Sequence, residues 1–201
     1  MRSLLSRVAL RVFAVLVAVW LLAPVLVVVP LAFAGTKSFV FPPETWSTQW
    51  FDELVTDPEW RDALLTSLRV AGFTVVLSAV LGTAAALGLQ RSRLRGLVVL
   101  RGLLVAPMVV PVVITAVGIY AVFLPRKLLG TDLGFVLAHT ALAMPFVVIA
   151  VTTSLTALDR RLEDAAASLG ASPVTTFFTV TLPLIRPGLL AGSVFAFIAS
   201  F

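Results

Sequence analysis

The sequence predicts an all-α protein that folds as a polytopic bundle of transmembrane helices. Hydrophobic residues make up 60% of the 201 residues and charged residues only 12%, whereas charged residues make up about 25% of ordinary soluble domains. The mean hydropathy is +1.08. Long apolar runs alternate with short polar segments that carry most of the charge. We therefore expect the lipid bilayer to be the main solvent of this chain.

The composition also excludes several classes of function. The chain has no cysteine, and His139 is its single histidine. Disulfides, iron–sulfur clusters and thiolate zinc sites are excluded, and we expect no metal and no other cofactor. The net charge of +5 could suggest a nucleic-acid partner. The basic residues, however, lie at the ends of apolar runs, where they indicate membrane topology, so no nucleic acid is expected.

The first predicted span covers residues 12–34, which carry no charge. It follows a basic N-terminus, residues 1–11, which contains Arg2, Arg7 and Arg11. The apolar run is about twice as long as the apolar core of a signal peptide, so a retained membrane helix is expected. Pro24 and Pro30 should kink this helix.

Residues 35–62 form a polar, acidic loop, predicted to lie outside the cell membrane. Its acids are Glu44, Asp52, Glu53, Asp57, Glu59 and Asp62. Trp46, Trp50 and Trp60 are interleaved with them, and tryptophan prefers the headgroup region of a bilayer. Two interpretations remain open, an anchor in the membrane interface and a docking surface for an external protein.

The second predicted span covers residues 63–90, with Arg69 near its outer end, where the side chain can reach the interface. Small residues recur along it and favour close helix packing in lipid. Residues 91–101 follow as a loop that carries basic residues and no acid, which is typical of the cytoplasmic side. Its basic residues are Arg91, Arg93, Arg95 and Arg101.

Two further spans are predicted at residues 102–124 and 133–158. Pro107 and Pro111 remove two backbone donors from the third span, which indicates either a broken helix that lines a pathway or an ordinary kink. In the fourth span, His139 lies two turns before Pro145. An ionisable group inside a membrane is a functional candidate, but a neutral imidazole can also serve packing by a hydrogen bond between helices. These four residues are our candidates for the pathway.

Residues 159–187 differ from the spans because they mix charged and small residues. Four small apolar residues recur at helical spacing and should form one close-packing face: Leu162, Ala165, Ala166 and Leu169. Gly170 can end this helix, and Ser172 with Pro173 should begin a second one. Pro183 and Pro187 are predicted to end the second helix before the next apolar run.

The fifth apolar run covers residues 188–201 and is too short to cross about 30 Å of hydrocarbon. We expect either a fragment of a longer reading frame or an unusual truncation.

A motif in residues 159–187 resembles the "EAA" loop of permeases from ATP-binding-cassette (ABC) importers. That loop has the pattern E-A-A-x3-G-x9-I-x-L-P. The matching residues are Asp164, Ala165, Ala166, Gly170, Val180, Leu182 and Pro183. Asp164 replaces the family's Glu, although Glu163 precedes it, and Val180 replaces Ile. The FPP…W…W stretch in residues 35–62 also resembles the first outer loop of spermidine/putrescine-type permeases.

The resemblance implies the fold of a type I importer permease whose last helix or helices are missing from this sequence. Residues 159–187 would dock on a cytosolic ATP-binding subunit. Glu163 and Asp164 would pair with basic groups of that subunit, Ala165 and Ala166 would permit close approach, and Gly170, Leu182 and Pro183 would shape the loop. The other implied partners are a second permease subunit and an extracytoplasmic substrate-binding protein.

Charge distribution predicts the orientation in the bacterial inner membrane. With the N-terminus in the cytoplasm, ten of the 15 basic residues lie inside and seven of the ten acids lie outside, as the positive-inside rule requires. The same orientation places residues 159–187 on the side where ATP is available.

The predicted function is therefore a non-enzymatic permease subunit of an importer, for polyamines or a related small solute. Permeases for ferric ion, sulfate, thiamine or a phosphonate remain alternatives, because they share the loop. A membrane-bound structural or assembly protein is the alternative from another class. A membrane enzyme is disfavoured, since the sequence offers no nucleophile–base pair and no cluster of metal ligands.

Overall fold

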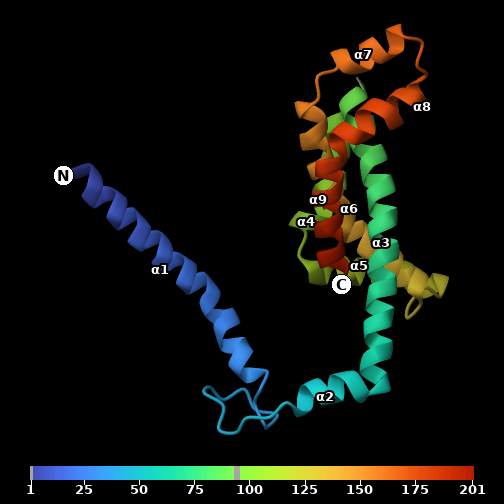
Figure 1. The fold of residues 1–201 in the computed structure, drawn as a ribbon. Coiled ribbons are helices and arrows are strands. Elements are labelled where there is room, and N and C mark those ends of the chain that lie inside the picture. Colours follow the sequence, from blue (N-terminus) through green and yellow to red (C-terminus); the bar gives the residue numbers. More distant parts are fainter. Residues whose placement is uncertain (1, 93–95) are drawn as a thin grey trace. The chain divides into compact units, whose positions relative to one another are not determined.

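The structure is a computed structural model that describes residues 2–92 and 96–201. Its helices in the first part are α1 (Arg2–Leu31), α2 (Gln49–Thr56) and α3 (Pro58–Arg91). The second part contains α4 (Leu97–Val109), α5 (Val112–Phe123), the 3-10 helix η1 (Leu124–Arg126), α6 (Asp132–Ala157), α7 (Arg161–Ser168), α8 (Pro173–Thr176), the π-helix η2 (Phe177–Thr181) and α9 (Leu182–Ser200). Figure 1 shows these elements. Met1, Arg93 and Arg95 of the predicted basic segments lie outside the described residues.

The helices confirm the predicted all-α class. In the described part of the chain, four helices are long and apolar enough to cross a membrane, or five if the bent pair α4 and α5 is one span. The chain divides into two compact units, residues 1–63 and 64–201.

The first unit contains α1 and a folded loop. The most apolar stretch of α1 has none of its residues buried against the described chain, which suits a helix whose solvent is lipid. After α1, the indole nitrogen of Trp50 donates to Ala34 O at 2.6 Å, and the side-chain amide of Gln49 donates to Gly35 O at 2.9 Å. These bonds hold α2 against the end of α1. Residues 35–62 are therefore folded locally.

Helix α3 begins earlier than the predicted span at residue 63. The Asp57 carboxylate accepts from Glu59 N at 2.8 Å, and Pro58 occupies the first helical position. An acidic cap followed by proline is a strong helix start. The acidic end of the predicted loop is consequently the first turn of this helix.

The predicted third span is broken into two helices. The axes of Leu97–Val109 and Val112–Arg126 are bent by 107°. Val110 is extended, as residues before proline tend to be, and Pro111 has a non-helical ψ of 132°. An ordinary kink is therefore the wrong interpretation at Pro111, whereas Pro107 remains inside α4. Helix α4 also includes Arg101, which the sequence pattern places in the preceding loop.

Helix α6 is the centre of the second unit. Val147 on α6 is fully buried, and it lies against Gly82 of α3 and Gly192 of α9. A Cβ atom on either glycine would come within 2.8 Å of an atom of Val147. The surrounding core consists of Ala86, Ala143, Val151, Leu155, Ile185 and Ala196. The predicted packing by small residues is confirmed at Gly82, because only a residue without a side chain fits this spacing.

The prediction that Pro183 and Pro187 end a helix is wrong. Both prolines lie inside α9, and the candidate span runs through Pro173–Ser200, 28 residues, instead of starting at residue 188. The π-helix explains why Pro183 is tolerated. Leu182 N bonds to Phe177 O, five residues back, and the next residue, Pro183, takes a position at the start of α9 that needs no N–H donor.

Gly82→Ala should destabilise the second unit by about 1–3 kcal/mol, because the added methyl group overlaps Val147 between packed backbones. Thermal unfolding in detergent measures this loss. Gly88→Ala in the same helix is the matched control, since a Cβ atom there meets nothing within 4 Å. Equal melting temperatures for the two variants would contradict the close packing.

Candidate functional site

The segment that carries the predicted motif, residues 159–181, lies at one end of the helices of the second unit. Figure 1 shows α7 and α8 side by side there, beyond the ends of α6 and α9. We call it the short-helix segment. It contains α7, a tight turn, α8 and η2.

The turn between α7 and α8 has the predicted geometry. Gly170 has a φ of +86°, a left-handed conformation that glycine adopts without strain. Ala171 N donates to Ala166 O at 3.0 Å and closes the end of α7. The Ser172 hydroxyl accepts from Thr175 N at 3.2 Å, and Pro173 is the first residue of α8. The predicted cap residues are therefore confirmed.

The apolar face of α7 is not covered by the described chain. None of the residues in α7 is buried. Leu169 is 89% exposed and Leu162 is 48% exposed. Ala165 is exposed and Ala166 half-buried. Thus the face that we predicted to pack closely remains largely exposed within the described residues.

The two acids of the segment have different surroundings. The Glu163 side chain is only 20% exposed, and it forms an ion pair with Arg91 at the end of α3, with 2.6 Å between Oε1 and Nη2. The Thr181 hydroxyl donates to the same oxygen. Asp164 is exposed, and no ion pair of its carboxylate occurs within the described ranges. Of the two acids, only Asp164 is therefore oriented for contact with another molecule.

A second contact supports the same junction. Arg160 Nη2 donates to Gln90 O at 3.2 Å, one residue before Arg91. The last turn of α3 is thus held by the start of the short-helix segment at two points. The sequence analysis missed Arg91 and Thr181 as site residues. In the sequence, Arg91 indicates only the cytoplasmic side of the membrane. Thr181 could have been noticed because it lies inside the matched motif, between Val180 and Leu182.

The remaining motif residues lie elsewhere. Leu182 and Pro183 belong to the first turn of α9, where Leu182 packs against the core cluster. They are continuous with a membrane-length helix. The structure therefore separates the motif into an exposed part on α7 and a part that joins the short-helix segment to α9.

The pathway candidates occupy two places. Pro107 and Pro111 lie in and after α4, at the break before α5. His139 and Pro145 lie on α6, where Pro145 is fully buried. His139 Nδ1 is 2.9 Å from the Ser200 hydroxyl on α9. This bond between two helices is the contact that the packing interpretation of His139 requires.

Arg69 also has a specific partner. We predicted only that it reaches the membrane interface, but Nη1 lies 3.1 Å from a carboxylate oxygen of Asp132 at the start of α6. Both side chains are about half exposed. This pair joins the N-terminal half of α3 to the start of α6, far along α3 from Arg91.

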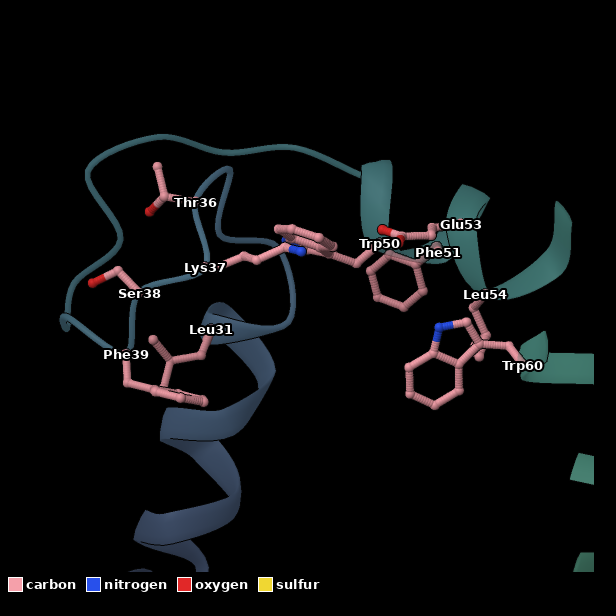
Figure 2. A pocket seen from close by; sticks show the side chains of 10 residues that line it. All are labelled: Leu31, Thr36, Lys37, Ser38, Phe39, Trp50, Phe51, Glu53, Leu54 and Trp60. Carbon is pink, nitrogen blue, oxygen red and sulfur yellow. The ribbon is translucent and has the colours of Figure 1, made fainter. Parts of the chain in front are cut away.

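A separate pocket of about 530 Å³ lies in the first unit (Figure 2). Its walls are mostly apolar and aromatic, and the lining residues are Leu31, Thr36, Lys37, Ser38, Phe39, Trp50, Phe51, Glu53, Leu54 and Trp60. The Lys37 ammonium lies 5.5 Å from the centre of the Trp50 ring, within the range of a cation–π contact. Two of the three interleaved tryptophans, Trp50 and Trp60, thus line a cavity.

Comparison with known proteins identifies the family. Residues 78–201 match the model of the family described as "Binding-protein-dependent transport system inner membrane component". The chain belongs to this family. The match begins within α3 and includes the whole short-helix segment. The resemblance seen in the motif is thereby confirmed, together with the fold class.

Three relatives show the range of this permease family. The chain is 36% identical to the putrescine transport system permease protein PotI of Escherichia coli (strain K12) over 188 residues, 90% of this chain and 66% of PotI. It is 30% identical to the spermidine/putrescine transport system permease protein PotC of Haemophilus influenzae over 200 residues, 98% of this chain and 76% of PotC. It is also 36% identical to the molybdenum transport system permease protein ModB of Mycobacterium tuberculosis over 167 residues, 77% of this chain and 62% of ModB. The chain thus spans about two thirds of the length of these permeases.

Proposed function

We propose that this chain is the membrane-spanning subunit of an ATP-driven importer, and that α7 is its contact with a separate ATP-hydrolysing subunit. The observation that carries the proposal is the largely exposed apolar face of α7 and its C-cap residue Leu169, whose side chain is 89% exposed. An exposed apolar face on an ordered helix is typical of a docking surface. Asp164, beside this face, supplies a charge for a basic partner.

The source of energy follows from what the sequence lacks. It contains no G-x-x-x-x-G-K-[ST] motif for binding phosphate groups of ATP. Within the described candidate spans, acidic residues occur only near the starts of α3 and α6, whereas coupling to protons or sodium usually needs acids deep in the membrane. The driving free energy therefore enters through a partner, and the short-helix segment is the place where that partner can push.

The proposed orientation has the N-terminus and the short-helix segment in the cytoplasm of a bacterial cell. Clusters of arginine adjoin both α3 and α7, whereas residues 35–62 carry six acids and two basic residues. The positive-inside rule assigns the arginine-rich ends to the cytoplasm. The pocket of Figure 2 then lies on the outer side, where we propose that residues 35–62 meet a substrate-binding protein. A second permease subunit would complete the membrane portion.

We propose a polyamine as the transported solute, because PotI and PotC are named as permeases for putrescine and for spermidine and putrescine. ModB is named as a molybdenum permease, so molybdate is the second candidate.

Single cysteines test the orientation, since the chain has no native cysteine. Leu169→Cys and Phe39→Cys place thiols on side chains that are 89% and 93% exposed. A membrane-impermeant maleimide should label Phe39→Cys in intact cells and should label Leu169→Cys only after permeabilisation. The reverse pattern would place α7 away from ATP and would overturn the proposed function.

Leu169→Glu should weaken binding of the ATP-hydrolysing subunit by at least about tenfold, because a charge enters the centre of an apolar contact. The measurement is titration of the purified permease with the ATP-hydrolysing subunit of the same transporter. Val55→Glu is a matched control, since Val55 is 80% exposed on α2, another eight-residue helix. Unchanged binding by Leu169→Glu would contradict docking at α7.

Uptake by the assembled transporter tests the solute. Labelled putrescine should accumulate in an ATP-dependent manner, and excess spermidine should compete with it whereas molybdate should not. Uptake of molybdate without uptake of putrescine would assign the chain to the second candidate.

A further inference from the structure

The Glu163 carboxylate joins three separate elements. Its Oε1 atom accepts from Arg91 at the end of α3 and from the Thr181 hydroxyl at the end of η2, while Glu163 itself lies in the first turn of α7. Thr181 is fully buried. In this three-way junction, Glu163 and Thr181 are largely enclosed and Arg91 is about half exposed.

The position of Glu163 separates it from the docking face. Consecutive residues of an α-helix point about 100° apart, so the side chains of Glu163 and Asp164 are directed differently. Glu163 is directed toward Arg91, and Asp164 is exposed. We therefore assign Glu163 a role in contacts within the chain instead of the expected contact with a partner.

We infer that Glu163 is a positioning residue that makes α7, α3 and α9 move together when the ATP-hydrolysing subunit displaces α7. This inference rests on the proposed function and adds how the movement of α7 reaches the membrane helices.

A movement of α7 can reach the membrane helices along the chain or through the contacts of Glu163. Along the chain, α7 is followed by the turn at Gly170, and a glycine backbone can change conformation more readily than that of other residues. A push on α7 would be absorbed by rotation at this hinge if the chain were the only connection. The Arg91 contact transfers the push to α3, and the Thr181 contact transfers it to the start of α9.

The junction is strong enough for this role because of its charge and burial. Hydrogen bonds to charged groups are stronger than those between neutral groups. Removing the carboxylate would leave the buried Thr181 hydroxyl without its acceptor. The contact between Arg160 and Gln90 O lies beside it and prevents the end of α3 from turning independently.

The test uses the complete transporter in proteoliposomes, with putrescine as the transported probe. Glu163→Gln keeps the shape and removes the charge. It should raise the ATP consumed per putrescine by about tenfold, as expected for loss of a charge-assisted bond, while affinity for the ATP-hydrolysing subunit stays unchanged. Asp164→Asn should have the converse effect. It should lower the affinity for the ATP-hydrolysing subunit without changing the ATP consumed per putrescine.

Pairwise variants separate this role from a general structural defect. Arg91→Gln should resemble Glu163→Gln, and the double variant should be no worse than either single variant, because one interaction is lost in all three. The charge reversal Arg91→Glu with Glu163→Arg should restore most of the coupling. Arg69→Gln is the matched control, since it breaks the ion pair in the N-terminal half of α3 and should leave the ATP consumed per putrescine unchanged.

Thr181→Val keeps the ion pair between Glu163 and Arg91 and removes only the hydroxyl. The ATP consumed per putrescine should therefore rise by about threefold, even where the Glu163→Gln transporter does not assemble. Normal coupling in either variant, or additive effects in the double variant, would overturn the inference while leaving docking at α7 intact. A wild-type chain that binds no ATP-hydrolysing subunit would instead refute the proposed function, and the inference with it.

Discussion

The second unit depends on the close approach of three helices around Val147. In lipid there is little hydrophobic drive for helices to associate, so contact between backbones has to supply the attraction. Gly82 and Gly192 permit this contact from two sides of α6. The cross-helix bond from His139 to Ser200 and the ion pair from Arg69 to Asp132 add polar contacts toward one end. The packed helices form a firm base for the opposite end.

At that end, the exposed helix α7 lies against the ends of the packed helices. Glu163 fixes the underside of α7 to α3 and η2, whereas Asp164 and Leu169 remain available. The proposed docking contacts, Asp164 and Leu169, are thus different residues from Glu163, which binds the helices beneath. The two neighbouring acids of the motif have different surroundings.

The sequence predicted those features that depend on local chemistry. The left-handed Gly170, the Ser172 cap and the approximate bounds of α6 all follow from residue preferences and periodicity. The continuous helix through Pro183 and Pro187 could not be predicted in this way, because a π-helical turn places Pro183 where no N–H donor is needed and Pro187 is accepted inside the helix. The partner of Glu163 was also hidden, since Arg91 lies 72 residues away along the chain.

The exposed face of α7 also bears on the life of the subunit before assembly. A leucine that is 89% exposed at the end of a membrane bundle faces water until a partner covers it. Chaperones and proteases recognise such apolar surfaces, and proteins that display them have short lifetimes in cells. Under the proposed function, the abundance of this subunit would therefore follow the supply of its partner, and copies made in excess would be degraded.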